Sequence, residues 1–205
     1  MTHLSSITAS VGALPQRAQA LFALGCAERM APVFRRWARP ASVKVFNDIL
    51  DTAWQSVTSE NCITNAKRSL DLIDQLPEAM VDDSVGTESE YYAMVSLSVL
   101  AYAFQSLIGN ELSVAIESAC SAALDLCGNC DFVIGKKGIR KIFYGQDPFP
   151  TDELESVEMT AQNATAHVLR NATNVDESLC KNIRQMAKEA SVQLTHALPK
   201  MFQPL

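Results

Sequence analysis

Residues 91–108 read YYAMVSLSVLAYAFQSLI and contain no charged side chain. A membrane-spanning helix needs about 20 predominantly apolar residues. This stretch is marginal in length, carries four Ser and Gln side chains, and is flanked by Glu88, Glu90 and Glu111 rather than by Lys or Arg anchors. The sequence therefore predicts a helix at 88–108 that is buried on nearly all sides in a protein core, and no membrane span.

The helical period repeats on both sides of this stretch. In SVKVFNDILDTAWQSV, residues 42–57, apolar side chains recur at intervals of three and four, which is typical of one helix face. Prolines and glycines fall between such stretches and predict the helix ends. We expect helices at 14–38 (kinked or broken around Pro32), 42–57, 62–76, 88–108, 110–127, 152–171 and 176–197.

These patterns predict an all-α fold. We expect a single domain, residues 1–205, formed by a bundle of about seven helices around the central helix at 88–108. Residues 1–13 are expected to be a loose N-terminal segment, and 131–150 an irregular basic linker. No repeat at a solenoid period is visible.

The composition limits the partners of the chain. Its 17 basic and 23 acidic residues give a net charge of −6, which disfavours nucleic-acid binding unless a local basic patch exists. The N-terminus does not resemble a secretory signal. The six cysteines are dispersed through helical patterns, which indicates reduced thiols and predicts a cytoplasmic protein.

One Cys-x-x-Cys pair, Cys127 and Cys130, raises the question of redox or zinc chemistry. A redox dithiol uses a helix N-terminus to stabilise its thiolate. Here Cys127 is expected to end a helix, with Gly128 and Asn129 as the C-cap. A structural zinc would need two more nearby ligands, and none is evident. We therefore expect buried thiols, no metal site and no cofactor.

Residues 135–145 form a basic segment that also contains Phe143 and Tyr144. The spacing does not match a P-loop. A solvated turn is the simpler interpretation, and a contact patch for an acidic partner protein is the alternative. The candidate contact residues are Lys136, Lys137, Arg140 and Lys141. No motif for catalysis is present elsewhere in the chain.

Residues 22–38, FALGCAERMAPVFRRWA, place Glu28 among apolar neighbours. An unpaired buried carboxylate is costly, so Glu28 needs a partner, for which Arg29, Arg35 and Arg36 are candidates. The sequence leaves open whether Glu28 and Arg29 form a structural ion pair or part of a polar pocket.

The segments CAERMAPVF and FNDILDTAWQSV resemble the signature of the YjaG-like family of uncharacterised bacterial proteins. The resemblance extends over about residues 14–127. It implies a compact all-helical fold and no established activity, so it assigns no functional residue. The matching positions are Glu28, Arg29, Pro32, Ile49, Leu50, Asp51 and Trp54.

Two functional hypotheses follow. The first is a non-catalytic protein that binds another protein or itself, one form of which is an immunity-type inhibitor with an acidic surface. The alternative is a small-ligand or enzymatic site between the first two helices. It would be built from Glu28, Arg29, Asp51 and Trp54, and it requires these side chains to converge on a cavity.

Overall fold

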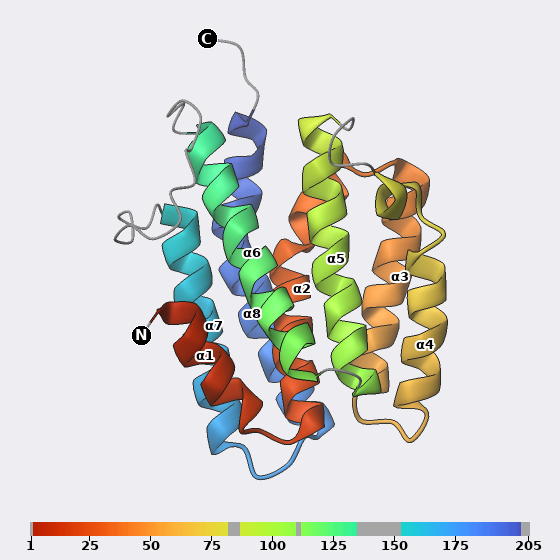
Figure 1. The fold of residues 1–205 in the computed structure, drawn as a ribbon, viewed down its shortest axis with the longest axis vertical. Helices are drawn as coiled ribbons and strands as arrows, with labels where there is room; N and C mark the ends of the chain where they lie inside the picture. The colour runs from red at the N-terminus through yellow and green to blue at the C-terminus, as the bar shows by residue number, and fades with distance from the viewer. Residues whose placement is uncertain (1, 82–86, 110–111, 135–152, 202–205) are drawn as a thin grey trace.

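The computed structural model describes residues 2–81, 87–109, 112–134 and 153–201, and this part of the chain is helical throughout without a strand (Figure 1). The all-α fold class is thereby confirmed. The elements are α1 (His3–Gly12), α2 (Gln16–Trp37), α3 (Pro40–Ser56), α4 (Cys62–Ile73), the 3₁₀ helix η1 (Pro77–Met80), α5 (Glu88–Ile108), α6 (Leu112–Ile134), α7 (Glu153–Asn171), α8 (Glu177–Ala197) and the 3₁₀ helix η2 (Leu198–Lys200).

Helices α2 and α5 lie side by side at the centre of the bundle (Figure 1). The helix at 88–108 has the predicted bounds and packs against α2, α4 and α6. Among the described residues it is also the one helix long and apolar enough to cross a membrane, with 56% of the tested window buried inside the protein. Core helices of soluble proteins have the same property, so the finding is weak evidence for a span.

Helix α2 is largely buried. Sixteen of its 22 residues are buried, including every residue from Ala18 to Ala31. The helix continues past Pro32 to Trp37 instead of breaking there. Because this part of α2 is buried against several helices, chiefly α5, α6, α7 and α8, its polar side chains must find partners on neighbouring helices.

The N-terminal segment differs from the expectation of a loose tail. Residues 3–12 form α1, whose first turn is capped by the Thr2 hydroxyl accepting from the Ser5 amide at 3.2 Å. Ile7 and Val11, one turn apart, are buried against α6 and α7. Gln19 donates to the carbonyl oxygens of Gly12 and Leu14 and thereby fixes the turn into α2.

Helix α6 also runs further than expected. Cys127 does not end it, because the helix continues through Gly128 and Asn129 to Ile134. Packing of Cys127 and Cys130, both almost fully buried, stabilises these additional turns more than the Gly-Asn pair weakens them. The rest of the expected linker, 135–150, lies outside the described residues.

Both ends of α5 are fixed by local interactions. Thr87 and Glu90 form a capping box, with Thr87 N–H donating to Glu90 Oε2 at 2.8 Å. At the other end Gly109 has a φ of +87° and ends the helix in the left-handed conformation. Gln16 Nε2 donates to the carbonyl oxygen of Leu107 at 2.9 Å, beside this turn.

The Gly109→Ala variant is expected to lower the free energy of unfolding by about 1–2 kcal/mol. Alanine disfavours the left-handed conformation, and its Cβ would lie 2.6 Å from Gln16 Nε2. The matched control is Gly12→Ala, where no atom lies within 4 Å of the new Cβ and φ is not positive. Urea denaturation of both variants should show a loss for the first alone; equal losses would contradict the argument.

Candidate functional site

The most deeply buried polar contact joins α2 to α7. Arg29 Nε lies 2.7 Å from Glu158 Oε2, and Arg29 Nη2 lies 2.8 Å from Glu158 Oε1, so the pair is bidentate. Arg29 is 1% exposed and Glu158 is 2% exposed. Glu158 was not singled out in the sequence, because its partner is 129 residues away.

Further side chains extend this ion pair into a buried network. Gln162 Nε2 donates to Glu158 Oε1 at 3.0 Å and to the Cys120 carbonyl oxygen at 3.2 Å. Arg29 Nη2 also donates to Cys26 Sγ at 3.2 Å. His3 Nε2, in α1, lies 3.2 Å from Gln162 Oε1. The network therefore joins α1, α2, α6 and α7.

The electrostatics of the network keep Arg29 charged. Burial by itself lowers the pKa of the Arg29 guanidinium, but the nearby Glu158 carboxylate and its hydrogen bond outweigh that effect. The pKa of Arg29 is consequently raised above its ordinary value. Glu158 balances this charge in the core, where an unpaired cation would be costly.

The remaining nitrogen of Arg29 has no partner among the described residues. Nη1 is buried and makes no hydrogen bond, although the other two nitrogens of the guanidinium are fully engaged. Gly25, one turn earlier on α2, leaves room for it, since a Cβ there would lie 3.3 Å from Nη1. Buried donors in native proteins are almost always satisfied, so an unpaired one requires a physical explanation.

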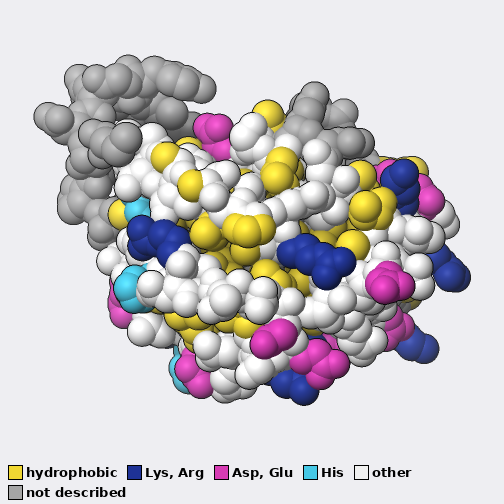
Figure 2. All heavy atoms as spheres, turned by 90° about the horizontal axis from the view of Figure 1, so that it is seen from below, with side chains coloured by type: hydrophobic (Ala, Val, Ile, Leu, Met, Phe, Trp, Pro, Cys, Tyr) yellow, Lys and Arg dark blue, Asp and Glu magenta, His cyan; other side chains and the backbone are white. Residues whose placement is uncertain are grey.

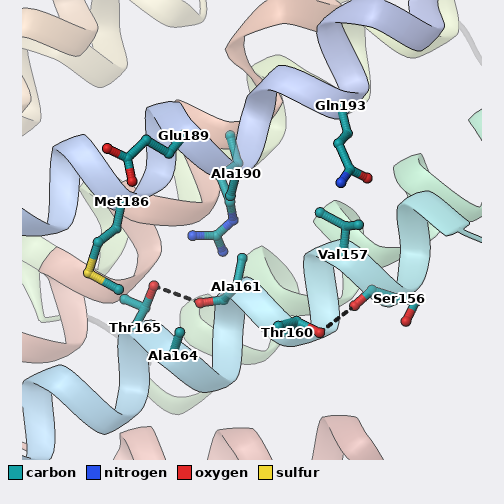
Figure 3. Close-up of a pocket in the computed structure, with 11 residues that line it drawn as sticks. Ser156, Val157, Thr160, Ala161, Ala164, Thr165, Met186, Glu189, Ala190 and Gln193 are labelled. Carbon is teal, nitrogen blue, oxygen red and sulfur yellow. Dashed lines mark hydrogen bonds between the residues drawn. The ribbon is translucent and has the colours of Figure 1, made fainter.

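Arg29 lines the floor of a groove of about 440 Å³ between α7 and α8, which we call the α7/α8 groove. In Figure 3 Val157 and Ala161 point from α7 toward α8, while Gln193 points from α8 toward α7. The other residues that line the α7/α8 groove are Ser156, Thr160, Ala164, Thr165, Met186, Glu189 and Ala190.

The threonine hydroxyls of the groove are already engaged as donors. Thr160 Oγ1 donates to the Ser156 carbonyl oxygen at 2.9 Å, and Thr165 Oγ1 donates to the Ala161 carbonyl oxygen at 2.8 Å (Figure 3). Arg29 Nη1 is thus a buried donor without a partner at the floor of the groove. The other lining residues are half apolar (Val157, Ala161, Ala164, Met186 and Ala190) and half polar.

The other predicted site residues form a second cluster. Trp54 Nε1 donates to Glu28 Oε2 at 2.7 Å, and Arg184 of α8 donates from Nε to the same oxygen at 3.0 Å. Arg184 Nη2 also pairs with Asp51. The Arg184 guanidinium carbon lies 5.7 Å from the centroid of the Trp54 ring, which adds a cation–π contact.

This arrangement separates the four predicted residues. Glu28, Asp51 and Trp54 converge on Arg184 of α8, whereas Arg29 points to Glu158 of α7. A cavity of about 280 Å³ beside the second cluster is lined by Trp54 and Arg184 but by neither carboxylate. Glu28 thus forms a structural ion pair with Arg184. The sequence had suggested Arg29, Arg35 or Arg36 as its partner, and Arg184 was not among them.

The cysteine pair is buried, as the sequence predicted. Cys127 is 2% exposed and Cys130 is fully buried. Burial, reinforced by Asp131, raises the pKa of the Cys130 thiol to about 12. Burial also raises the pKa of Cys127, with a further contribution from Glu158. Within the described ranges, no group of three or more His, Cys, Asp or Glu side chains is placed to hold a metal ion.

These raised thiol pKa values predict a loss of stability in alkali. An unfolded thiol ionises near pH 8.5–9, whereas the folded Cys130 thiol stays protonated until about pH 12. The stabilisation that comes from keeping this thiol protonated is complete below about pH 9 and is lost as the pH rises toward 12. Cys130→Ala should therefore flatten the fall in the free energy of unfolding by about 1.4 kcal/mol per pH unit in this range. The free energy of unfolding of the wild-type protein and of Cys130→Ala is measured by urea denaturation at about pH 8 and 10.5. An equal fall between these two pH values in both proteins would contradict the prediction.

The four basic residues proposed as a contact patch, Lys136, Lys137, Arg140 and Lys141, lie outside the described residues.

Comparisons with known proteins agree with the fold. A family model described as "Protein of unknown function (DUF416)" matches residues 6–193. The crystal structure of a DUF416 family protein from Shewanella baltica OS155 is similar in fold, with a TM-score of 0.70 and 17% sequence identity, covering 89% of this chain and 93% of that chain. At this identity the likeness concerns the fold alone. No curated protein matches the sequence.

Proposed function

The chain belongs to the DUF416 family of proteins of unknown function, and from this premise we propose that it binds a small molecule in the α7/α8 groove. The ligand carries a hydrogen-bond acceptor that pairs with Arg29 Nη1, and its apolar body packs between the walls of the groove. This places the small-ligand hypothesis at α7 and α8 instead of between the first two helices.

The unpaired Nη1 of Arg29 is the observation that carries the proposal. A buried donor without a partner costs about 1–3 kcal/mol. A ligand acceptor at Nη1 would remove this cost. Part of the binding free energy would therefore come from satisfying a donor that is unsatisfied in the unliganded protein. Because Arg29 is 1% exposed, the ligand must displace flexible groove side chains to reach Nη1. Met186 is the best suited to move, since methionine has several rotatable bonds.

The shape and lining of the groove agree with such a ligand. Ligand sites are commonly concave, largely apolar and equipped with few polar groups that fix orientation. Here Val157, Ala161 and Ala190 provide apolar surface, and Arg29 provides the orienting donor. Most of the small lining side chains belong to α7, and Ala190 is the small one on α8.

Filling the groove tests this proposal. Ala190→Leu should block binding, although Ala190 also lies beside Arg29 and Glu158, so urea denaturation must show that the variant stays folded. Ala122→Leu, at a half-buried position on α6 outside the groove, is the matched control. The probe is leucinamide, observed by chemical-shift changes of the α7 and α8 amides, with an expected Kd of about 1 mM. If leucinamide no longer changes these chemical shifts in Ala122→Leu, or still changes them in Ala190→Leu, the ligand does not bind in the groove.

Protein binding is the second candidate function, and the exposed apolar surface favours it. Figure 2 shows hydrophobic side chains gathered in a band between two groups of Lys or Arg at one end of the bundle. Ile63 and Val114, near the starts of α4 and α6, are 46% and 54% exposed. Apolar patches of this kind often mark protein–protein contacts. An immunity-type inhibitor is one form of this proposal.

Self-association is the simplest form to measure. Val114→Glu should shift a concentration-dependent dimer to monomer in sedimentation, whereas Val192→Glu, a 46% exposed valine on α8, should not. A wild-type protein that stays monomeric at about 0.1 mM would refute self-association through this end.

We also propose two narrower assignments. Membership of the YjaG-like group is supported by CAERMAPVF and FNDILDTAWQSV, and a cytoplasmic location is supported by six cysteines without a disulfide.

A further inference from the structure

The charges around the α7/α8 groove do not favour a simple anion. Arg29 is the cation that lines it, but Glu158 already neutralises that cation through two hydrogen bonds. Glu189, on α8, lines the groove as well and is exposed. The local sum of one positive and two negative charges is −1. A carboxylate or phosphate in the groove would meet a donor at the floor and net repulsion around it.

Glu189 has room for a cationic partner. Its carboxylate accepts a hydrogen bond from Gln185 Nε2 at 2.8 Å, and no Lys, Arg or His in the described ranges pairs with it. In Figure 3 Glu189 lies on the same helix as Met186 and Ala190, which form part of the apolar wall. The groove therefore combines a buried donor, apolar side chains and an exposed carboxylate that has no cationic partner among the described residues.

From this combination we infer that the ligand is a primary amine that also carries a carbonyl acceptor. The carbonyl oxygen pairs with Arg29 Nη1, the ammonium group pairs with Glu189, and a short apolar body fills the space beside Val157 and Ala161. This inference rests on the proposed function, because it names the ligand class for the same groove.

Four probes with one carbon skeleton separate the contributions. Leucinamide has an ammonium group and a neutral carbonyl; leucine has an ammonium group and a carboxylate. 4-Methylpentanamide has the carbonyl alone, and 4-methylpentanoate has the carboxylate alone. Binding is measured by NMR titration at about pH 6.5, where the α-amino groups are charged. Leucinamide should bind about fivefold more tightly than 4-methylpentanamide, as expected for a partly exposed ion pair, and 4-methylpentanoate should bind most weakly.

The role of Glu189 is tested by Glu189→Gln. This variant should bring leucinamide and 4-methylpentanamide to within about twofold of each other. Glu177→Gln is the matched control, because it removes the same charge from α8 at a position 12 residues away that does not line the groove. It should retain the fivefold preference of the wild-type protein.

The outcomes distinguish the two proposals. If 4-methylpentanoate binds as tightly as leucinamide, or if Glu189→Gln keeps the preference for the amine, the amine assignment is wrong while the groove remains a ligand site. If none of the four probes shifts the α7 and α8 amides at about 10 mM, both proposals are wrong.

Discussion

Replacing Glu158 with alanine is expected to lower the free energy of unfolding by about 3–5 kcal/mol. The change removes both acceptors of the Arg29 fork and leaves a 1% exposed guanidinium without a counter-charge. It also removes an acceptor from Gln162. Since small proteins are stable by about 5–15 kcal/mol, this single change consumes a large share of the total. Urea denaturation at neutral pH measures it.

Two further variants separate charge burial from general damage. Glu177→Ala breaks the Lys181–Glu177 pair, whose side chains are 80% and 79% exposed, and removes an acidic residue from the first turn of α8, so it should cost less than about 1 kcal/mol. The double variant Arg29→Met with Glu158→Leu removes both charges and should recover most of the loss, because apolar replacements of buried ion pairs are often well tolerated. A double variant as unstable as Glu158→Ala would show that packing, not the unpaired charge, causes the loss.

The second large effect is expected for Glu28→Ala, at about 2–4 kcal/mol. Glu28 Oε2 accepts from the buried indole of Trp54 and from Arg184. Without it the Trp54 N–H is left unsatisfied in a position that is 5% exposed, and the contact between α2 and α8 loses its ion pair.

Asp51 provides a matched control on the same cation. Its carboxylate also pairs with Arg184, but its side chain is 55% exposed. Asp51→Ala should therefore cost less than about 1 kcal/mol. Thermal unfolding of the two variants at equal ionic strength gives the comparison. Similar losses for Glu28→Ala and Asp51→Ala would contradict the view that burial decides the strength of this cluster.

The helices were predictable because their signals are local. Thr87, Glu90 and Gly109 bound the central helix with a capping box and a left-handed end, and both signals lie within a few residues of the helix. Where the prediction failed, packing overrode a local signal. Gly128 and Asn129 suggest a helix end, yet burial of Cys127 and Cys130 carries α6 to Ile134. The polar N-terminus hides α1, whose stability comes from packing Ile7 and Val11 on α6 and α7.

The candidate site was predictable in part. The position of Glu28 in an apolar helix correctly indicated a carboxylate that needs a partner. The partner is Arg184, 156 residues away, and not one of the neighbouring arginines. Adjacent residues on a helix point in directions about 100° apart and reach different neighbours. Arg29 therefore pairs with Glu158 and not with the adjacent Glu28.

The sequence by itself determined that this protein is a helical bundle, that 88–108 is a core helix and that the thiols are buried. Periodicity and caps act within a few turns, so they can be recognised without knowing the neighbours. Only the tertiary structure decided which charges pair and that Arg29 Nη1 stays unpaired at the floor of a groove. Both depend on how α2, α7 and α8 approach each other, and that approach is fixed by packing between segments more than 100 residues apart.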